Sequence, residues 1–244
     1  MRLWAIVLLV GMFFTVPLAL VSFGKTAKQE AGRMGGGQAV ISLPAPRLDG
    51  DCSVEKALSK RRSVRSYRAE PLTINELGQL LWAAYGITKE MPLPAFLRGG
   101  LRTAPSAGAL YPLEIYAVVG EVTGLAPGIY RYESEGHALR KIASGDSRKE
   151  LAHAAWEQSF IAKAPVVLVY SGVFARTTGK YGERGRARYV CMDLGHSAQN
   201  VYLQAEALGL GTCAVGAFDD EAVRKVMGLK SEEEPLYIMP VGKK

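Results

Sequence analysis

The chain has 244 residues, a mass of 26.3 kDa and 48% hydrophobic residues, enough to bury the core of one large domain. This composition excludes a disordered or fibrous protein. The net charge of +7 favours anionic ligands, but no basic run is interleaved with aromatic residues, so we expect no nucleic-acid partner. Three cysteines without a C-x-x-C pair argue against a disulfide framework or structural zinc, and we expect no metal site.

The N-terminus carries an uncharged stretch over residues 3–23. Its length suits a membrane anchor, which needs about 20 apolar residues, whereas Pro17 and the small residues of Ser22-Phe23-Gly24 suit a cleaved signal peptide. The sequence leaves both readings open for residues 1–24. Either one predicts a domain outside the cytoplasm, in a periplasmic or other extracytoplasmic compartment, with membrane attachment through residues 3–23 as one alternative.

Residues 25–50 contain three consecutive glycines and two prolines, which is typical of a flexible linker, so the folded domain is expected to span residues 51–244. A short helix is expected over residues 53–60. Thr73 and Glu76 then form a capping box ahead of an apolar pattern with helical spacing, which Gly86 ends.

The rest of the chain mixes helices and strands without a repeat, which indicates one α+β domain. Bounding Gly and Pro residues predict strands over 114–120 and 165–171 and a hairpin from Gly128 onward. We further expect helices over 148–162 and 192–208, a strand over 212–218, a short helix capped by Asp219 or Asp220, and a last strand from Pro235.

Common catalytic motifs do not occur in this sequence. It contains no G-x-S-x-G elbow, no Walker A sequence and no H-E-x-x-H. The glycine-rich stretch over residues 209–216 lies between a predicted helix and a predicted strand, the reverse of the order in a dinucleotide-binding fold. We therefore exclude a Rossmann-type site.

An arginine cluster follows the first predicted helix. It consists of Arg61, Arg62, Ser63 and Arg65. Guanidinium groups match phosphate oxygens with two parallel hydrogen bonds, and a serine hydroxyl adds a compact donor. The cluster is therefore either a phosphate clamp or a solvated basic turn, and the motif alone leaves both open.

Two small-residue segments suit a flat ring that lies against the backbone. The first, residues 102–112, includes Ser106 and Gly108 and precedes a predicted strand, and the second is the strand predicted over 212–218. Small side chains let backbone N–H and C=O groups reach polar ring atoms. The alternative for the first segment is an ordinary surface loop.

The chain resembles the nitroreductase superfamily of flavin enzymes in four motifs. In chain order these are RRSVR, APSAGALYP, GLGTCAVGAFDD and the final MPVG. Within it the chain is most similar to the SagB/ThcOx-type dehydrogenases, through the hairpin GIYRYESEGHALRKI and the block from Lys180 to Asn200. The resemblance covers residues 53–242. It implies an α+β, three-layer α/β/α sandwich that forms an intertwined homodimer with FMN at the dimer interface.

The resemblance also assigns the phosphate end of the cofactor. Arg61, Arg62, Ser63 and Arg65 are expected to hold the FMN phosphate and ribityl chain. Many relatives complete this site with basic residues beyond the last strand. Here only the lysines at 243 and 244 follow it, so Lys243 is the candidate.

The resemblance also assigns the residues around the isoalloxazine ring of FMN, and it divides them between the two subunits of the dimer. One chain is expected to back one edge of the isoalloxazine, with a backbone N–H facing flavin N5, while the partner subunit lines the ring with its small-residue loop. The edge residues are Ala214, Val215 and Gly216, and the loop residues are Pro105, Ser106, Ala107 and Gly108.

A Lys-Tyr pair is implicated in catalysis in the azoline-oxidising relatives, and Lys180-Tyr181 stands at the matching place. The alternative is a mobile loop with a solvated lysine. We expect an FMN-dependent oxidoreductase that transfers hydride through flavin N5 to or from a small organic or azoline-type substrate, with NAD(P)H or a quinone left open as electron partner. Alternatives are a non-catalytic flavin-binding or sequestering protein of the same fold, or a structural module without cofactor.

Overall fold

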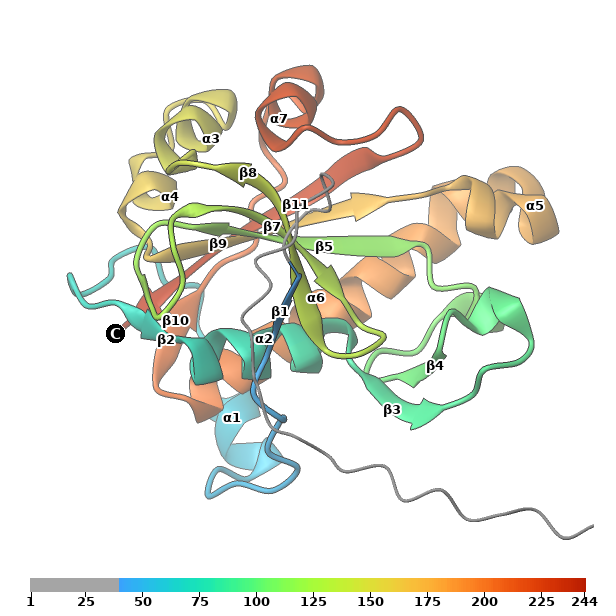
Figure 1. Ribbon diagram of the computed structural model, residues 1–244, viewed down its shortest axis with the longest axis horizontal. Coiled ribbons are helices and arrows are strands. Elements are labelled where there is room, and N and C mark those ends of the chain that lie inside the picture. Colours follow the sequence, from blue (N-terminus) through green and yellow to red (C-terminus); the bar gives the residue numbers. More distant parts are fainter. Residues whose placement is uncertain (1–39) are drawn as a thin grey trace, which may run out of the picture. The chain divides into compact units, whose positions relative to one another are not determined.

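The computed structural model describes residues 40–244, which form an α+β fold around a central antiparallel sheet (Figure 1). The predicted signal peptide or anchor, and the predicted linker as far as residue 39, lie outside these residues. The sheet has seven strands, and all neighbouring pairs are antiparallel. Its order is β1 (Val40–Ser42), β8 (Ala138–Ser144), β7 (Gly128–Glu133), β5 (Leu113–Val119), β9 (Val166–Gly172), β11 (Glu234–Lys243) and β10 (Leu210–Thr212).

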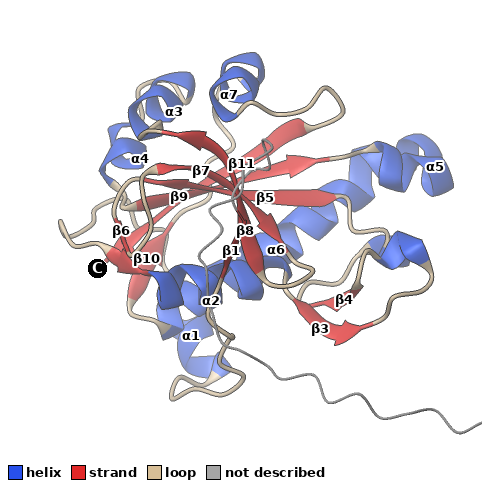
Figure 2. Ribbon diagram, in the orientation of Figure 1, coloured by secondary structure: helices blue, strands red, loops and turns tan. Residues whose placement is uncertain are grey.

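Helices cover both faces of the sheet, as Figure 2 shows. Successive residues of β5 alternate between two buried cores, because side chains of a strand point to opposite faces. Ile115 and Ala117 pack in the core under α2 and α6, and Tyr116 and Val118 in the core under α3, α4 and α7. The predicted α+β class and its three layers are confirmed. The helix bounds are α1 (Val54–Lys60), α2 (Ile74–Tyr85), α6 (Val190–Ala207), α3 (Arg148–Ala154), α4 (Ser159–Lys163) and α7 (Asp220–Met227).

Helix α2 begins at the predicted capping box. The Glu76 N–H donates to Thr73 Oγ1 at 3.2 Å, and the Thr73 N–H donates to the Glu76 carboxylate at 2.8 Å. These bonds satisfy amides that have no partner within the helix. Leu77 and Leu80, at helical spacing, are fully buried against the sheet.

The remaining elements lie outside the main sheet. Strands β2 (Leu72–Thr73) and β6 (Val122–Thr123) form a short parallel pair. Residues 87–102 form a β3–β4 lobe, made of β3 (Ile87–Glu90), the 3-10 helix η1 (Ala95–Leu97) and β4 (Gly100–Arg102). A second 3-10 helix, η2 (Ala107–Ala109), follows it. In Figure 1 the lobe and α5 (Ala175–Arg184) project at the same end of the molecule, and a π-helical turn, η3 (Gly185–Tyr189), joins α5 to α6.

Three segments differ from the sequence-based expectation. The helix expected over 148–162 breaks into α3 and α4, because Trp156 and Glu157 adopt left-handed φ angles of 55° and 61°. The strand expected over 212–218 is reduced to β10, after which Val215 forms a single bridge with Ile238. Strand β1 lies within the stretch expected to be linker, where Val40–Ser42 pair with β8.

Among residues 40–244, no helix combines the length and hydrophobicity needed to cross a membrane.

We expect Thr73→Ala to lower the free energy of unfolding by about 1 kcal/mol, because the Glu76 N–H loses its acceptor at the start of α2. Urea denaturation measures this change. Ser59→Ala is the matched control, since the Ser59 hydroxyl donates only to the exposed Lys56 carbonyl within α1. A loss for Ser59→Ala as large as for Thr73→Ala contradicts the prediction.

Candidate functional site

The arginine turn, residues 61–65, lies against the end of β10. Ser63 forms a parallel bridge with Thr212, and the Val64 N–H donates to the Thr212 carbonyl at 2.9 Å. This pairing brings the turn next to Ala214, the first of the predicted ring-edge residues. Two segments that lie about 150 residues apart in the sequence therefore meet in the fold.

Tyr202 of α6 connects these two segments. Its hydroxyl accepts a hydrogen bond from the Ala214 N–H at 2.7 Å and lies 3.2 Å from Ser63 Oγ. The Arg61 guanidinium lies over the Tyr202 ring, 5.5 Å from its centroid. Arg61, Ser63 and Ala214 are thus gathered around one tyrosine, which the sequence analysis did not single out.

The other basic candidates make different contacts. Arg62 donates to the carbonyls of Ser59 and Arg61, at 3.1 and 2.8 Å. Arg65 lies 5.9 Å from the ring centroid of Phe160, a residue of α4. The Lys243 ammonium is ion-paired with Glu76 of the capping box. The structure therefore does not bring the side chains of Arg62 and Lys243 to Tyr202.

The backbone of the ring-edge segment is partly engaged. The Ala214 N–H is bonded to Tyr202, and the Val215 N–H donates to the Ile238 carbonyl at 2.9 Å. In the described part of the chain, the Gly216 N–H makes no such bond. Gly216 is thus the residue of this segment whose amide remains available to a ligand.

The predicted small-residue loop belongs to a longer ring loop, residues 103–111. The buried Asp193 carboxylate of α6 accepts hydrogen bonds from Ser106 Oγ and from the Ala107 N–H, the latter at 3.2 Å. Ser106 Oγ also accepts from the Tyr111 N–H at 2.9 Å. Burial raises the pKa of Asp193 despite these two donors. The loop is therefore held against α6 by a buried carboxylate.

Lys180 and Tyr181 lie on α5, directly against Gly108. Gly108 has a φ of 63°, and a Cβ at this position would lie 2.8 Å from Tyr181 Oη and 3.1 Å from Lys180 Nζ. The pair is helical and not in the loop that the alternative expects, but Lys180 is exposed and the Tyr181 ring packs edge-on against Tyr189 at 4.9 Å, as that alternative has it. The pair and the ring loop thus form one cluster.

One carboxylate holds α5 and the ring loop together. Arg176, in the first turn of α5, and Arg98 of the lobe reach Glu114 Oε1 at 2.6 and 2.8 Å. Both guanidinium groups also donate to the Tyr111 carbonyl, at 3.2 and 2.8 Å. Tyr111 itself has a left-handed φ of 47°. These contacts fix the position from which α5 presents Lys180 and Tyr181.

The two halves of the site lie on opposite faces of α6. Asp193, which holds the ring loop, and Tyr202, which holds the arginine turn, are nine positions apart in the helix. Nine residues advance the helix by about 13 Å and rotate it by about two and a half turns, so the two side chains point in opposite directions. Within one chain the two halves therefore face away from each other.

Comparison with known proteins identifies the class. The Nitroreductase family profile matches residues 58–243, so the chain is an oxidoreductase that belongs to the nitroreductase family. MJ1384 of Methanocaldococcus jannaschii, a protein assigned by name to the nitroreductases, is 50% identical over 204 residues, which are 84% of this chain and 97% of that protein. A crystal structure from Ralstonia eutropha, also assigned by name to the nitroreductases, has a TM-score of 0.70 and 29% identity, with 86% of this chain and 91% of that one covered.

The chain is also distantly homologous to SagB-like processing dehydrogenases. The microcin B17-processing protein McbC of Escherichia coli is 29% identical over 163 residues, which are 65% of this chain. This match spans only 57% of McbC. The family predicted from the sequence is confirmed by these comparisons.

We expect Tyr202→Phe to lower the free energy of unfolding by about 1–2 kcal/mol, because the Ala214 N–H loses its acceptor. Thermal unfolding of the cofactor-free protein measures this as a drop in Tm of several degrees. Tyr189→Phe is the control, since its hydroxyl makes an exposed contact with Arg184 Nε at 2.9 Å. An equal Tm for Tyr202→Phe and wild type contradicts the role given to Tyr202.

Proposed function

We propose that the chain is an FMN-dependent oxidoreductase whose cofactor binds between two copies of the chain. The observation that carries this proposal is the placement of the arginine turn and the ring loop on opposite faces of α6. In the proposed arrangement a second copy brings its ring loop to the arginine turn of the first, so that one flat cofactor contacts one half from each chain. The family, whose members typically bind FMN, supports the choice of cofactor.

The arginine turn fits the phosphate end of FMN. Arg61 lies over the Tyr202 ring and Ser63 beside the Tyr202 hydroxyl, and they offer a guanidinium group and a hydroxyl. Charge-assisted bonds from such groups to phosphate are among the strongest hydrogen bonds in proteins. Arg65 adds a positive charge from the other side of the turn, and Arg62 and Lys243 reach the phosphate only if they leave their present partners.

The ring loop and the ring-edge segment fit a flat heterocycle. Gly108 lacks a Cβ at the point where one would meet Tyr181, and this lets Tyr181 and Lys180 lie directly against the backbone of the ring loop. On the other half, the Gly216 N–H is free to donate to a ring nitrogen. Bound FMN supplies hydride transfer through N5, and donors near that atom tune its reactivity.

The residues that move protons in this proposal are Tyr181 and Lys180. Tyr181 Oη lies beside Gly108, where it can donate its proton to a substrate on the exposed ring face. The Lys180 ammonium lies 5.3 Å from the Tyr181 ring centroid, which places a positive charge beside the proposed proton donor. Neither side chain has an acidic partner among the described residues.

The proposed substrate is a small organic molecule, with an azoline-type peptide heterocycle as the runner-up supported by the distant homology to McbC. NAD(P)H and a quinone remain the two candidate electron partners. Export of the domain through residues 1–24 stays a proposal that rests on the sequence alone.

We expect the purified full-length chain to carry stoichiometric FMN, seen as flavin absorbance and identified by chromatography after heat release. Arg61→Ala combined with Arg65→Ala is expected to weaken FMN binding by about 3 kcal/mol or more, because charged hydrogen bonds contribute roughly 1.5–3 kcal/mol each. Arg68→Ala is the matched control, since Arg68 is exposed and pairs only with Glu70. Equal FMN affinity in wild type and the double variant contradicts the phosphate site.

A mixture of two inactive variants tests the shared site. Arg61→Ala/Arg65→Ala breaks the phosphate half, and Lys180→Ala/Tyr181→Phe breaks the catalytic half while FMN stays bound. In a mixed dimer one of the two sites combines the intact halves of both chains. We therefore expect each variant alone to be inactive, and subunit exchange to restore about a quarter of wild-type turnover under random pairing. Turnover is followed as NAD(P)H oxidation, or quinol oxidation, with a nitroaromatic acceptor.

Three outcomes of this experiment count against parts of the proposal. Full turnover by Lys180→Ala/Tyr181→Phe removes the catalytic assignment. Failure of the mixture to recover activity, although mixed dimers form, removes the site shared between chains. If the wild-type chain binds FMN but shows no turnover with either NAD(P)H or a quinol as electron donor, a flavin-sequestering protein is favoured instead.

A further inference from the structure

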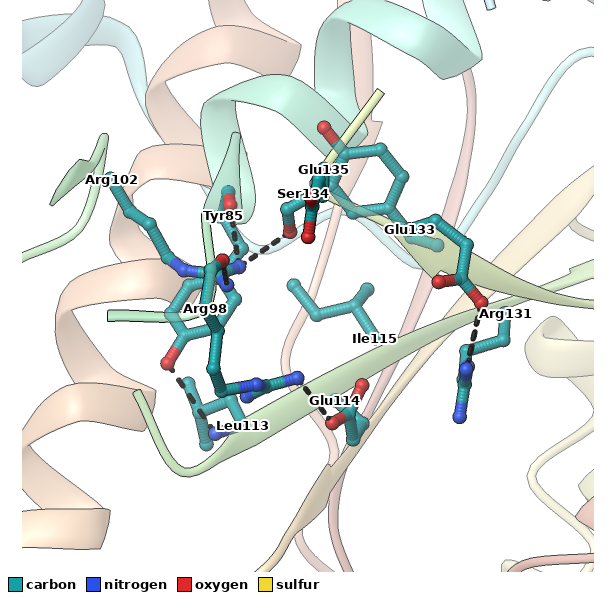
Figure 3. A pocket seen from close by; sticks show the side chains of 11 residues that line it. Tyr85, Arg98, Arg102, Leu113, Glu114, Ile115, Arg131, Glu133, Ser134 and Glu135 are labelled. Carbon is teal, nitrogen blue, oxygen red and sulfur yellow. Dashed lines mark hydrogen bonds and ion pairs between the residues drawn. The ribbon is translucent and has the colours of Figure 1, made fainter. Parts of the chain in front are cut away.

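A small polar cavity lies beside the ring loop but outside the proposed flavin site. Its volume is about 100 Å³, and it is enclosed by α2, β5, the lobe and the β7–β8 hairpin. Figure 3 shows Arg98 and Arg102 entering from one side, Arg131 and Glu133 at the opposite side, and Ile115 between them. Ser134 and Glu135, from the hairpin turn, complete the polar lining.

Arg102 is a cation of this cavity without a carboxylate partner. Its guanidinium donates only to neutral oxygens, the Tyr85 carbonyl at 3.2 Å, the Arg98 carbonyl at 3.2 Å and Ser134 Oγ at 2.5 Å. Arg102 Nε is buried and has no hydrogen-bond partner. The charge lies 4.5 Å from the Tyr85 ring centroid and 4.9 Å from that of Tyr111. Burial lowers the pKa of Arg102, and the nearby charge of Arg98 lowers it further.

The carboxylates of the cavity do not neutralise Arg102, because arginines already share them. Glu114 is paired with both Arg98 and Arg176. Glu133 is paired with both Arg131 and Arg140. The cavity lining itself carries three arginines and three glutamates, but Glu135 is exposed at the rim and the other two carboxylates each pair with two other arginines. Arg102 is thus left without a paired carboxylate, and a half-buried cation without a paired counter-ion is costly.

We propose that this cavity binds a small oxyanion, a carboxylate or a phosphate, on the Arg102 guanidinium and the Ser134 hydroxyl. Ser134 Oγ accepts a hydrogen bond from Arg102, so its own proton is free to be donated to the anion. A cavity volume of about 100 Å³ holds a small ion or several water molecules. This is room for inorganic phosphate or for the carboxylate end of a larger molecule, but not for a nucleotide.

The proposed anion acts on the ring loop through Tyr111. Arg102 stacks on the Tyr111 ring, and the Tyr111 N–H is bonded to Ser106 Oγ. An anion that holds Arg102 in place therefore also holds the ring loop, although it touches none of the residues assigned to the flavin.

Isothermal titration calorimetry of the FMN-loaded full chain tests the site, with inorganic phosphate in one arm and acetate in the other. FMN occupies the arginine turn, so the titrated anion meets the second site alone. We expect saturable binding of at least one anion, weakened about tenfold by Ser134→Ala and abolished by Arg102→Gln, with Arg68→Gln unchanged as a control.

The two arms distinguish the sources of the anion. Tighter binding of phosphate identifies a free ion site, and tighter binding of acetate identifies a carboxylate subsite. If Arg102→Gln does not fold, Ser134→Ala alone carries the test. Absence of binding in both arms, or equal affinity in wild type and Ser134→Ala, overturns the proposal. Because no turnover is measured, failure here leaves the proposed oxidoreductase function untouched.

Discussion

Helix α6 is the constraint on which the rest of the candidate site depends. It covers the sheet, and from opposite faces it fixes the ring loop through Asp193 and the arginine turn through Tyr202. Two side chains nine positions apart leave a helix in opposite directions. A single chain thus separates the ring loop from the arginine turn, and the proposal that two chains share a flavin site follows from this separation.

Local signals in the sequence predict much of the fold. The capping box at Thr73 and the pair of Asp219 and Gly228 set the ends of α2 and α7, because each acts through bonds to residues three or four positions away. Strand β1 and the break at Trp156 escape such reasoning. Val40–Ser42 become a strand only through pairing with β8, about 100 residues later. The left-handed φ at position 156 is adopted by a tryptophan and not by a glycine, so the sequence carries no signal for the break.

The residues of the candidate site also fall into those that the sequence predicts and those that it does not. Clusters such as Arg61–Arg65 and Ser106–Gly108 are visible because small or basic residues are adjacent in the sequence. Tyr202 and Asp193 are not, since their partners lie 139 and 87 positions away and each looks like an ordinary helical residue. The one usable signal for Asp193 is an acidic residue among the apolar, buried positions of α6.

The shared carboxylate of Glu114 links two parts of the protein that border the ring loop. The lobe reaches it through Arg98 and α5 through Arg176, and its side chain is only 9% exposed. If either arginine is replaced, the other still neutralises the carboxylate, so a single substitution leaves no bare charge behind. Glu114 is therefore a shared counter-ion that joins the lobe to α5 at the border of the ring loop.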